Sequence, residues 1–405
     1  MAESELLPKA WNLKESGLVA FSADAAREDE LDLYVVLPSL EQKWTALLDR
    51  ASRARTGNFM HFIVGSYGRG KSLSLFRIEQ IIHKEYPNLI IPIRLDFMNE
   101  ESVTPRNFLC RILAKIAQTW PIDSQNLNPA LDSILGLPLE YSEWRGVLGA
   151  IMLPPSIQRT SHGETLFGEE SNDAGPKPDL KRAAVRYLSG LSLTPAEHKG
   201  LQVEHRLDNI ETAWSIIAAL RIVLYDMGYH GVVLLVDEFE YLFSHVSKTR
   251  RPSYVALLRR MYDAGSPDGL SGHAMTSLNF FLGVSEGGMS EFTEMGKHES
   301  SSAGPTGALV SRIDSTVLTN LTLNQTRELI KKRLQRGRSG PSAAAQKKDY
   351  IIPFTEDFVA YVQDITMGLP REIVKTCRDV LEAGIAGGIT LLTKDFAEKV
   401  TSDRA

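Results

Sequence analysis

In the first part of the chain, short continuous apolar runs alternate with segments in which apolar residues recur at helical spacing. A short apolar run ends at Val64 and another spans Leu89–Phe97, and after each the apolar residues recur every three or four positions. Two later runs, Gly231–Val236 and Ser277–Val284, are largely apolar throughout, which is typical of strands buried on both faces. This order predicts an α/β fold with a parallel sheet sandwiched by helices.

The C-terminal part of the chain has helical periodicity alone. We therefore expect an all-helical lid over residues 321–405, after an α/β core over 58–320 and a helical lead-in over 1–57. Within the core, residues 121–206 contain short apolar pieces separated by prolines, and we expect an inserted, partly mobile subdomain there. The glycine- and serine-rich residues 287–307 predict a flexible loop. The helices expected in the lid span residues 322–334, 355–365 and 370–386.

Composition limits the class of protein without changing the predicted fold. The 405 residues are 43% hydrophobic and 23% charged, enough to bury one large core and a smaller one. No stretch approaches the roughly 20 apolar residues that span a bilayer. The acidic N-terminus lacks the features of a signal peptide, so we expect a cytoplasmic protein without a membrane partner. Cys110 and Cys377 have apolar, helical surroundings and are expected to be inert core residues.

The net charge of −5 argues against a protein covered by nucleic acid on all sides, but it permits a local basic face. One basic stretch lies around a Gly/Ser/Ala-rich segment of the lid, and its side chains could neutralise phosphates without reading sequence. A solvated lid face beside a loop is the alternative interpretation. The basic residues are Lys331, Lys332, Arg333, Arg336, Arg338, Lys347 and Lys348.

Directly after the first apolar run, the sequence from Gly65 to Ser72 fits the pattern G-x-x-x-x-G-K-[ST] of a phosphate-binding loop. Glycines let backbone N–H groups approach phosphate oxygens, and the dipole of the following helix favours the same negative charge. Lys71 is expected to reach the β- and γ-phosphates, and Ser72 to bind Mg²⁺. The sequence thus predicts nucleoside triphosphate binding, with contacts from Gly65, Ser66, Tyr67, Gly68, Arg69, Gly70, Lys71, Ser72 and Leu73.

Two acidic residues follow the apolar run that ends at Val236. The carboxyl ends of parallel strands meet at one edge of a sheet, so these residues are expected beside the phosphate-binding loop. Asp237 would hold the metal through Ser72 and water, and Glu238 would orient or deprotonate the attacking water. Ser285 directly follows the next run, and we expect it to face the γ-phosphate from the other side. These residues predict hydrolysis of the nucleotide as well as binding.

With these motifs, the chain resembles the AAA+ superfamily, especially the branch of the origin-recognition and Cdc6 ATPases and the TnsC/TniB transposition regulators. The resemblance covers roughly residues 37–115 and 207–386 and implies that ATP is the nucleotide. Gly368-Leu-Pro-Arg371 resembles the start of the lid helix whose sensor-2 arginine contacts the γ-phosphate, which assigns that role to Arg371. Glu286 stands where the origin-recognition branch often has Asn, so the sensor-1 role would fall to Ser285. No winged-helix domain of the kind found in that branch is expected after the lid.

A narrower likeness is to the ATP-binding proteins of BREX-type phage-defence islands. They have a comparable carboxylate strand, here Val236-Asp-Glu-Phe-Glu-Tyr241, and a later Ala-Leu-x-x-Arg segment, here Ala308–Arg312. Arg312 is the first candidate for an arginine finger that one subunit supplies to its neighbour, so a homo-oligomer is expected. Arg259 and Arg260 compete for that role.

Two function classes stay open. In the first, the chain is an oligomerising ATPase that acts as a switch or motor on DNA or on a DNA-bound partner, in phage defence or mobile-element biology. In the second, it is a nucleotide-dependent scaffold or signalling ATPase that docks an effector protein on residues 121–206 and does not bind DNA. Hydrolysis that DNA stimulates, and that weakens steeply with salt, would distinguish the first class from the second.

Overall fold

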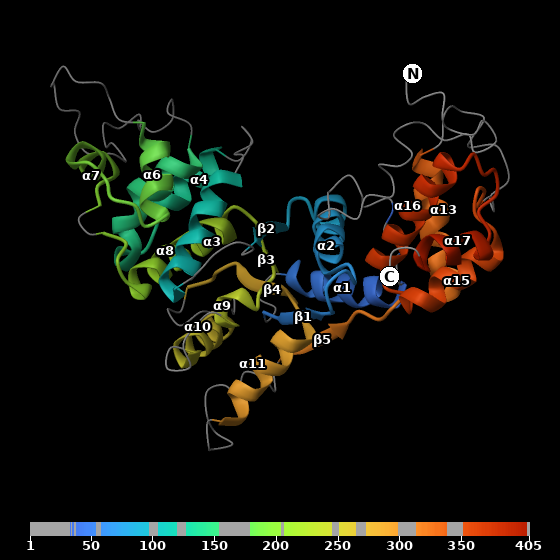
Figure 1. Ribbon diagram of the computed structural model, residues 1–405. Helices are drawn as coiled ribbons and strands as arrows, with labels where there is room; N and C mark the ends of the chain where they lie inside the picture. Colours follow the sequence, from blue (N-terminus) through green and yellow to red (C-terminus); the bar gives the residue numbers. More distant parts are fainter. Residues whose placement is uncertain are drawn as a thin grey trace. The chain divides into compact units, whose positions relative to one another are not determined.

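The structure of the protein is a computed structural model (Figure 1). The chain divides into two compact units. One unit consists of residues 1–41, 64–77 and 317–405, and the other of residues 42–63 and 78–316. The residues that the structure describes are 33, 35, 38–53, 58–96, 104–119, 127–153, 179–203, 206–244, 251–264, 273–298, 313–337 and 351–402.

Five strands form one sheet, and most of their residues belong to the larger unit. They are β1 (Met60–Val64), β2 (Ile90–Asp96), β3 (Gly231–Asp237), β4 (Ser277–Val284) and β5 (Asp314–Val317). Their order in the sheet is β2-β3-β4-β1-β5, and β3 pairs in parallel with both β2 and β4. Every residue of β1 and β4 is buried, which matches their apolar sequences. The predicted α/β class with a parallel sheet is confirmed.

The apolar pattern predicts four of these strands and misses β5. This strand has the sequence Asp-Ser-Thr-Val, in which Thr316 alone is buried. It lies at the edge of the sheet beside β1. A short edge strand with so few buried positions has no apolar run that a sequence pattern could reveal.

Helices precede, connect and follow the strands. Those outside the insertion and the lid are α1 (Pro38–Ala51), α2 (Lys71–Glu85), α3 (Pro105–Thr119), α8 (Ile210–Asp226), α9 (Tyr241–Ser244), α10 (Arg251–Ala264) and α11 (Glu286–His298). On α1, the residues that recur at helical spacing, Trp44, Leu48 and Ala51, are the buried ones. Across the described part of the chain, no helix is both long enough and apolar enough to cross a membrane.

A buried arginine ties three of these elements together. Arg221 on α8 is 3% exposed, and its Nε donates a hydrogen bond of 2.7 Å to the carbonyl oxygen of Thr276, directly before β4. Its Nη1 donates to the carbonyl oxygen of Ala264 at the end of α10. Burial lowers the pKa of Arg221 to about 10, so the side chain still carries its charge at neutral pH. Backbone carbonyl dipoles thus compensate a cation inside the core.

The described residues within 121–206, the range of the predicted insertion, are mainly helical. The elements are α4 (Leu127–Leu135), the 3-10 helix Leu139–Trp144, α5 (Arg145–Met152), α6 (Leu180–Leu188) and α7 (Pro195–Leu201). Helix α4 packs on α8 and α6 packs on α3, as the green and teal ribbons of Figure 1 show. Pro195 begins α7 directly after Thr194, which forms a capping box with Glu197, so this proline starts a helix. Residues 154–178 lie outside the described part of the chain.

The prediction of a flexible loop over residues 287–307 is wrong in its first part, where α11 forms. The Ser285 hydroxyl accepts the backbone N–H of Gly288 at 3.0 Å and caps the first turn. Phe292 on α11 is fully buried and packs against Phe62 and Phe239. This cap and this aromatic anchor offset the low helix propensity of the glycines. Residues 299–307 lie outside the described residues.

The lid consists of helices with a core of their own. They are α13 (Leu323–Gly337), α15 (Glu356–Thr366), α16 (Pro370–Ala386) and α17 (Lys394–Ser402). Phe358, Cys377 and Leu381 are among the fully buried residues of this core. The predicted all-helical lid is confirmed, although α17 was not anticipated. Cys377 and the likewise buried Cys110 are free thiols, and burial raises the pKa of each.

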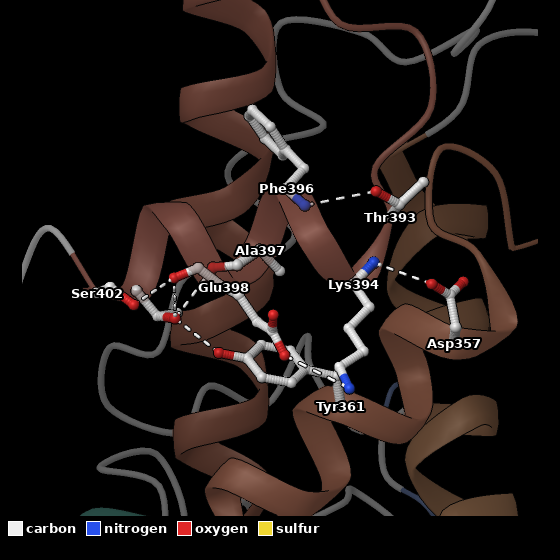
Figure 2. Close-up of polar contacts among 9 residues, drawn as sticks. Asp357, Tyr361, Thr393, Lys394, Phe396, Ala397, Glu398 and Ser402 are labelled. Carbon is white, nitrogen blue, oxygen red and sulfur yellow. Dashed lines mark hydrogen bonds and ion pairs between the residues drawn. The ribbon is translucent and has the colours of Figure 1, made fainter.

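Side-chain contacts attach α17 to α15 (Figure 2). The Asp357 carboxylate accepts the backbone N–H of Lys394 at 3.1 Å, at the start of α17. Near its end, the Thr401 hydroxyl lies 2.7 Å from the Tyr361 hydroxyl. The Lys394 Nζ also lies 3.4 Å from a carboxylate oxygen of Glu398, one turn further along α17. Helix α17 is therefore fixed to α15 at both ends.

A buried histidine lies where β1 runs beside β5. His61 is fully buried, with its Nε2 2.8 Å from the Thr316 hydroxyl and its Nδ1 3.6 Å from Asp314 Oδ2. The Lys43 ammonium reaches the same Asp314 at 3.0 Å. Burial lowers the pKa of His61 to about 4, Lys43 adds to the lowering, and the Asp314 carboxylate opposes it. His61 is therefore uncharged at neutral pH.

Protonation of His61 should make stability fall as the pH drops from 6.5 to about 4. The unfolded chain binds this proton at the ordinary histidine pKa and the folded chain only at the lower one, so acid favours unfolding in this window. The difference corresponds to about 3 kcal/mol. We expect His61→Gln to flatten the free energy of unfolding against pH, measured by urea denaturation, whereas His83→Gln at an exposed position should keep the wild-type profile. An unaltered profile for His61→Gln would contradict this assignment.

Candidate functional site

The turn from β1 into α2 has the backbone that a phosphate-binding loop requires. Gly68 and Gly70 have φ values of 84° and 93°, which residues with a side chain rarely adopt. Helix α2 begins at Lys71, so unpaired N–H groups of its first turn face the preceding loop. The Lys71 side chain is buried, and its Nζ donates to the carbonyl oxygen of Gly65 at 3.1 Å. The loop thus combines backbone donors with a positioned ammonium group, the donor set that binds phosphate.

Arg69 connects this loop to the segment that leads into the lid. Its backbone N–H donates to the carbonyl oxygen of Ser66 at 3.2 Å and closes the turn. Its side chain extends away from the turn: Nε donates to Asn320 Oδ1 at 2.9 Å, and Nη1 donates to the Leu318 carbonyl oxygen at 3.2 Å. Asn320 in turn donates to the carbonyl oxygen of Met367 at 2.7 Å. The guanidinium group of Arg69 therefore links the loop to the lid.

Arg371, the predicted sensor arginine, lies beside the loop. It is the second residue of α16, and its guanidinium carbon is 4.4 Å from the centre of the Tyr67 ring. A Cβ atom added to Gly68 would lie 2.7 Å from the Cβ of Arg371, too close for any residue but glycine. The loop and Arg371 belong to the same compact unit. Their proximity is a requirement of the predicted sensor-2 role.

A left-handed turn fixes the start of α16. Met367 and Gly368 have φ values of 49° and 74°. The Gly368 carbonyl accepts the Leu321 N–H at 2.8 Å, and a Cβ added to Gly368 would lie 2.2 Å from the Leu321 carbonyl oxygen. Gln363 donates to that same oxygen at 2.8 Å. The turn thereby sets where the backbone of Arg371 lies.

The two predicted carboxylates lie at the carboxyl end of β3, in the other unit. Asp237 ends the strand, and its Oδ1 accepts the Glu238 N–H at 3.0 Å. Glu238 has a φ of 48°, a left-handed conformation that costs a residue with a side chain on the order of 1 kcal/mol. Asp96, the last residue of β2, is in register with Asp237. The sequence analysis did not identify Asp96 as a neighbour of Asp237. Its position near the end of the apolar run Leu89–Phe97 would have suggested this.

Ser285, the predicted sensor-1 residue, lies directly after β4 and is joined to the β3 end by Glu240. Its N–H donates to Glu240 Oε1 at 3.0 Å, while its hydroxyl caps α11. The other carboxylate oxygen of Glu240, Oε2, is buried and has no hydrogen-bond partner among the described residues. Glu240 thus holds the tips of β3 and β4 together. It is a second residue that sequence reasoning missed.

The arginine-finger candidates differ in their surroundings. Arg312 lies outside the described residues. Arg259 forms an ion pair within α10. Both carboxylate oxygens of Glu211 on α8 accept hydrogen bonds from Arg260, whose guanidinium carbon is also 5.9 Å from the centre of the Trp214 ring. The Arg260 guanidinium group is therefore already bound by Glu211 of the same chain.

The described part of the basic stretch on α13 does not form a continuous exposed face. Arg333 is 6% exposed and lies inside the lid. Lys331 is half-buried and lies 3.6 Å from Glu328, and Lys332 is half-buried too. Arg336 is exposed. The remaining residues of the stretch, Arg338, Lys347 and Lys348, lie outside the described residues.

The predicted site residues fall into two groups. The loop Gly65–Leu73 and Arg371 lie in one unit, and Asp237, Glu238 and Ser285 lie in the other. Within the described ranges, no group of three or more His, Cys, Asp or Glu side chains is arranged to hold a metal ion by itself. Mg²⁺ that binds with a nucleotide takes most of its ligands from phosphates and water, so one hydroxyl and one carboxylate are a sufficient protein contribution. Ser72 carries such a hydroxyl and Asp237 such a carboxylate, each in its own unit.

A family model described as "BREX system ATP-binding protein BrxC/D" matches residues 170–383, which is more than half of the chain. The matched range contains Asp237, Glu238, Ser285 and Arg371, and it begins after the phosphate-binding loop. The match confirms the resemblance to BREX ATP-binding proteins that the motifs predicted. No curated protein matches the sequence.

The comparison with solved structures gives matches of low sequence identity. The Cdc6p structure of Pyrobaculum aerophilum is 11% identical, with 96% of this chain and 71% of that chain covered and a TM-score of 0.48. The Aeropyrum pernix ORC2 protein is 14% identical, with 90% and 67% covered and a TM-score of 0.46. Drosophila ORC bound to DNA is 12% identical, with 98% and 68% covered and a TM-score of 0.45. Similarities this low do not reveal what this chain binds.

Replacement of Gly368 by alanine should destabilise the lid strongly. The new Cβ would meet the Leu321 carbonyl oxygen at 2.2 Å in a left-handed backbone, and we expect a loss of about 2–4 kcal/mol. Gly388→Ala is the matched control, because its φ is also positive, 61°, but nothing lies within 4 Å of the added Cβ. It should cost about 1 kcal/mol. Equal losses in the free energy of unfolding for the two variants would contradict the close contact.

Removal of the Glu240 carboxylate should expose the Ser285 amide to exchange. In Glu240→Ala the N–H of Ser285 loses its acceptor, which corresponds to about 1–2 kcal/mol and therefore to roughly tenfold faster hydrogen exchange at Ser285. Glu240→Gln keeps an acceptor oxygen and should keep most of the protection. NMR or mass-spectrometric exchange of the Ser285–Gly288 segment would measure both. Unchanged exchange in Glu240→Ala would show that this contact does not hold the β4 tip.

Proposed function

Since the chain belongs to the BREX system ATP-binding protein BrxC/D family, we propose that it is a Mg²⁺-dependent ATPase that binds ATP at the loop Gly65–Leu73. The observation that carries this proposal is the loop itself. Its left-handed glycines, the helix start at Lys71 and the buried Lys71 ammonium group form a binding surface for the phosphates of a nucleotide.

In the proposed reaction, each residue has a separate task. Lys71 and the loop N–H groups bind the β- and γ-phosphates, and Ser72 and Asp237 hold Mg²⁺. The ion supplies charge neutralisation at the phosphates when it is bound. Glu238 orients the attacking water and accepts its proton. Ser285 and Arg371 are assigned to the γ-phosphate, from the strand tip and from the lid.

Completion of the site by a neighbouring subunit is part of the proposal. Arg312 remains the first candidate for an arginine finger, and the engagement of Arg260 by Glu211 supports that preference over Arg260. An arginine finger stabilises the charge that develops on the transferred phosphate and contributes roughly 10³–10⁵ to turnover in other nucleotidases. Hydrolysis would then require homo-oligomers, and ATP would favour their assembly.

The first candidate for the partner of this oligomeric switch is DNA or a DNA-bound protein. The family description suggests phage defence as the biological setting. An effector protein docked on the insertion is the second candidate. The described part of this region, helices α4 to α7, supplies a folded surface on which such a partner would dock. The partial burial of the basic stretch on α13 gives the DNA proposal little support from that helix.

Turnover of ATP by three variants tests the proposed site. Lys71→Ala should lose ATP binding, because the phosphates lose their ammonium partner. Glu238→Gln should bind ATP but turn it over at least about 100-fold more slowly, because the general base is absent. Lys375→Ala, an exposed position on α16, is the matched control and should behave as wild type. Wild-type protein without ATPase activity, alone or in oligomers, would refute the proposal.

The same assays with double-stranded DNA, together with sizing in each nucleotide state, separate the two partner classes. DNA-stimulated turnover that declines steeply with salt, and larger species with ATP, would support the DNA-linked oligomeric switch. Turnover that ignores DNA at low salt, from a species that stays monomeric, would contradict it and favour an effector docked on the insertion.

A further inference from the structure

Tyr67 combines two properties that the phosphate-binding pattern does not require. Its position in the pattern accepts any residue, yet here it carries an aromatic ring that is 64% exposed. The guanidinium carbon of Arg371 lies 4.4 Å from the centre of that ring, which is the geometry of a cation–π contact. We propose that Tyr67 is a positioning residue that orients Arg371 for contact with the γ-phosphate of the bound nucleotide. This inference rests on the proposed ATPase function.

A contact with the ring is compatible with phosphate binding by Arg371. A guanidinium group stacks through its face, whereas its N–H donors point outward in its plane. A ring that contacts Arg371 through the guanidinium face leaves the in-plane N–H donors available to phosphate oxygens. Tyr67 and a phosphate can contact the same guanidinium group together.

The backbones on both sides of the contact are also fixed. Gly68, next to Tyr67, approaches Arg371 so closely that an added Cβ would lie 2.7 Å from the Arg371 Cβ. On the loop side, Arg69 donates to Asn320, and on the lid side the turn at Gly368 sets the start of α16. With both backbones placed, the ring selects among the conformations of the long Arg371 side chain.

This arrangement predicts an effect on ATP that is absent for ADP. An arginine that is already oriented loses less conformational freedom when it binds its ligand, so preorganisation increases affinity. Arg371 is assigned to the γ-phosphate, which ADP lacks. The contribution of Tyr67 should therefore appear in the ratio of the two affinities.

The test compares binding of a non-hydrolysable ATP analogue and of ADP, by calorimetry with Mg²⁺, to the full chain and its variants. Tyr67→Leu should lower the preference for the ATP analogue by about two- to fivefold, the factor expected from one exposed cation–π contact. Tyr67→Phe keeps the ring and should keep the preference. In an Arg371→Met background, Tyr67→Leu should cause no further change in the ratio, because the residue that it orients is gone.

The outcomes separate this inference from the ATPase proposal. Wild-type protein that binds neither nucleotide would refute the ATPase function itself. Wild-type binding with an unchanged or increased ratio in Tyr67→Leu would overturn the positioning role alone. Equal losses for both nucleotides would also overturn it, because they would show that the ring supports the loop and not Arg371.

Discussion

Strands β1 and β4 are buried along their whole length, and β3 is buried up to its last residue. Side chains on such strands face apolar surroundings on both sides of the sheet, so an unpaired polar group there would be costly. His61 illustrates the exception, since it is held between Thr316 and Asp314 and is uncharged at neutral pH. Asn279 inside β4 is likewise paired, since it accepts the Phe59 N–H at 3.1 Å. The predicted site residues of the sheet lie instead at the strand ends. Asp96, Asp237 and Ser285 all lie at carboxyl ends or directly after them.

The predicted phosphate-binding loop is shaped by residues of the lid as well as by its own glycines. The Arg69 side chain donates hydrogen bonds to Asn320 and to the Leu318 carbonyl oxygen. Only glycine fits at position 68, because an added Cβ would clash with Arg371. In the proposed ATPase, the ligand would thus bind to a loop that the lid already shapes. Movement of α16 and occupation of the loop would be coupled through short, direct contacts, without a long relay across the protein.

The sequence allowed the fold class, four strands and the helices of the lid to be predicted, because these elements have strong apolar periodicity. The limits of the helix Pro370–Ala386 agree with the structure to the residue. The segment after Ser285 was predicted to be a loop because it is rich in glycine and serine. The helix that forms there is stabilised by the Ser285 cap and by Phe292, whose aromatic partners are distant in sequence. β5 was missed because it has one buried residue.

In the candidate site too, contiguous motifs could be predicted, whereas contacts between residues far apart in the sequence could not. The loop motif and the acidic pair could be recognised because each is a contiguous pattern. The register of Asp96 with Asp237, the hydrogen bond from Ser285 to Glu240 and the contact of Arg371 with the Tyr67 ring join residues far apart in the chain. A single sequence contains no local signal for such pairs. The roles of the individual site residues remain predictions.

The unit that contains the loop is assembled from three separate segments, residues 1–41, 64–77 and 317–405. During synthesis the chain emerges from the N-terminus at about 5–20 residues per second, so the loop leaves the ribosome many seconds before the lid. Asn320, the Gly368 turn and Arg371 do not yet exist when Gly68 and Arg69 first appear. The surface proposed to bind ATP can therefore reach its final form only after Arg371 has emerged, later than the strands of the sheet.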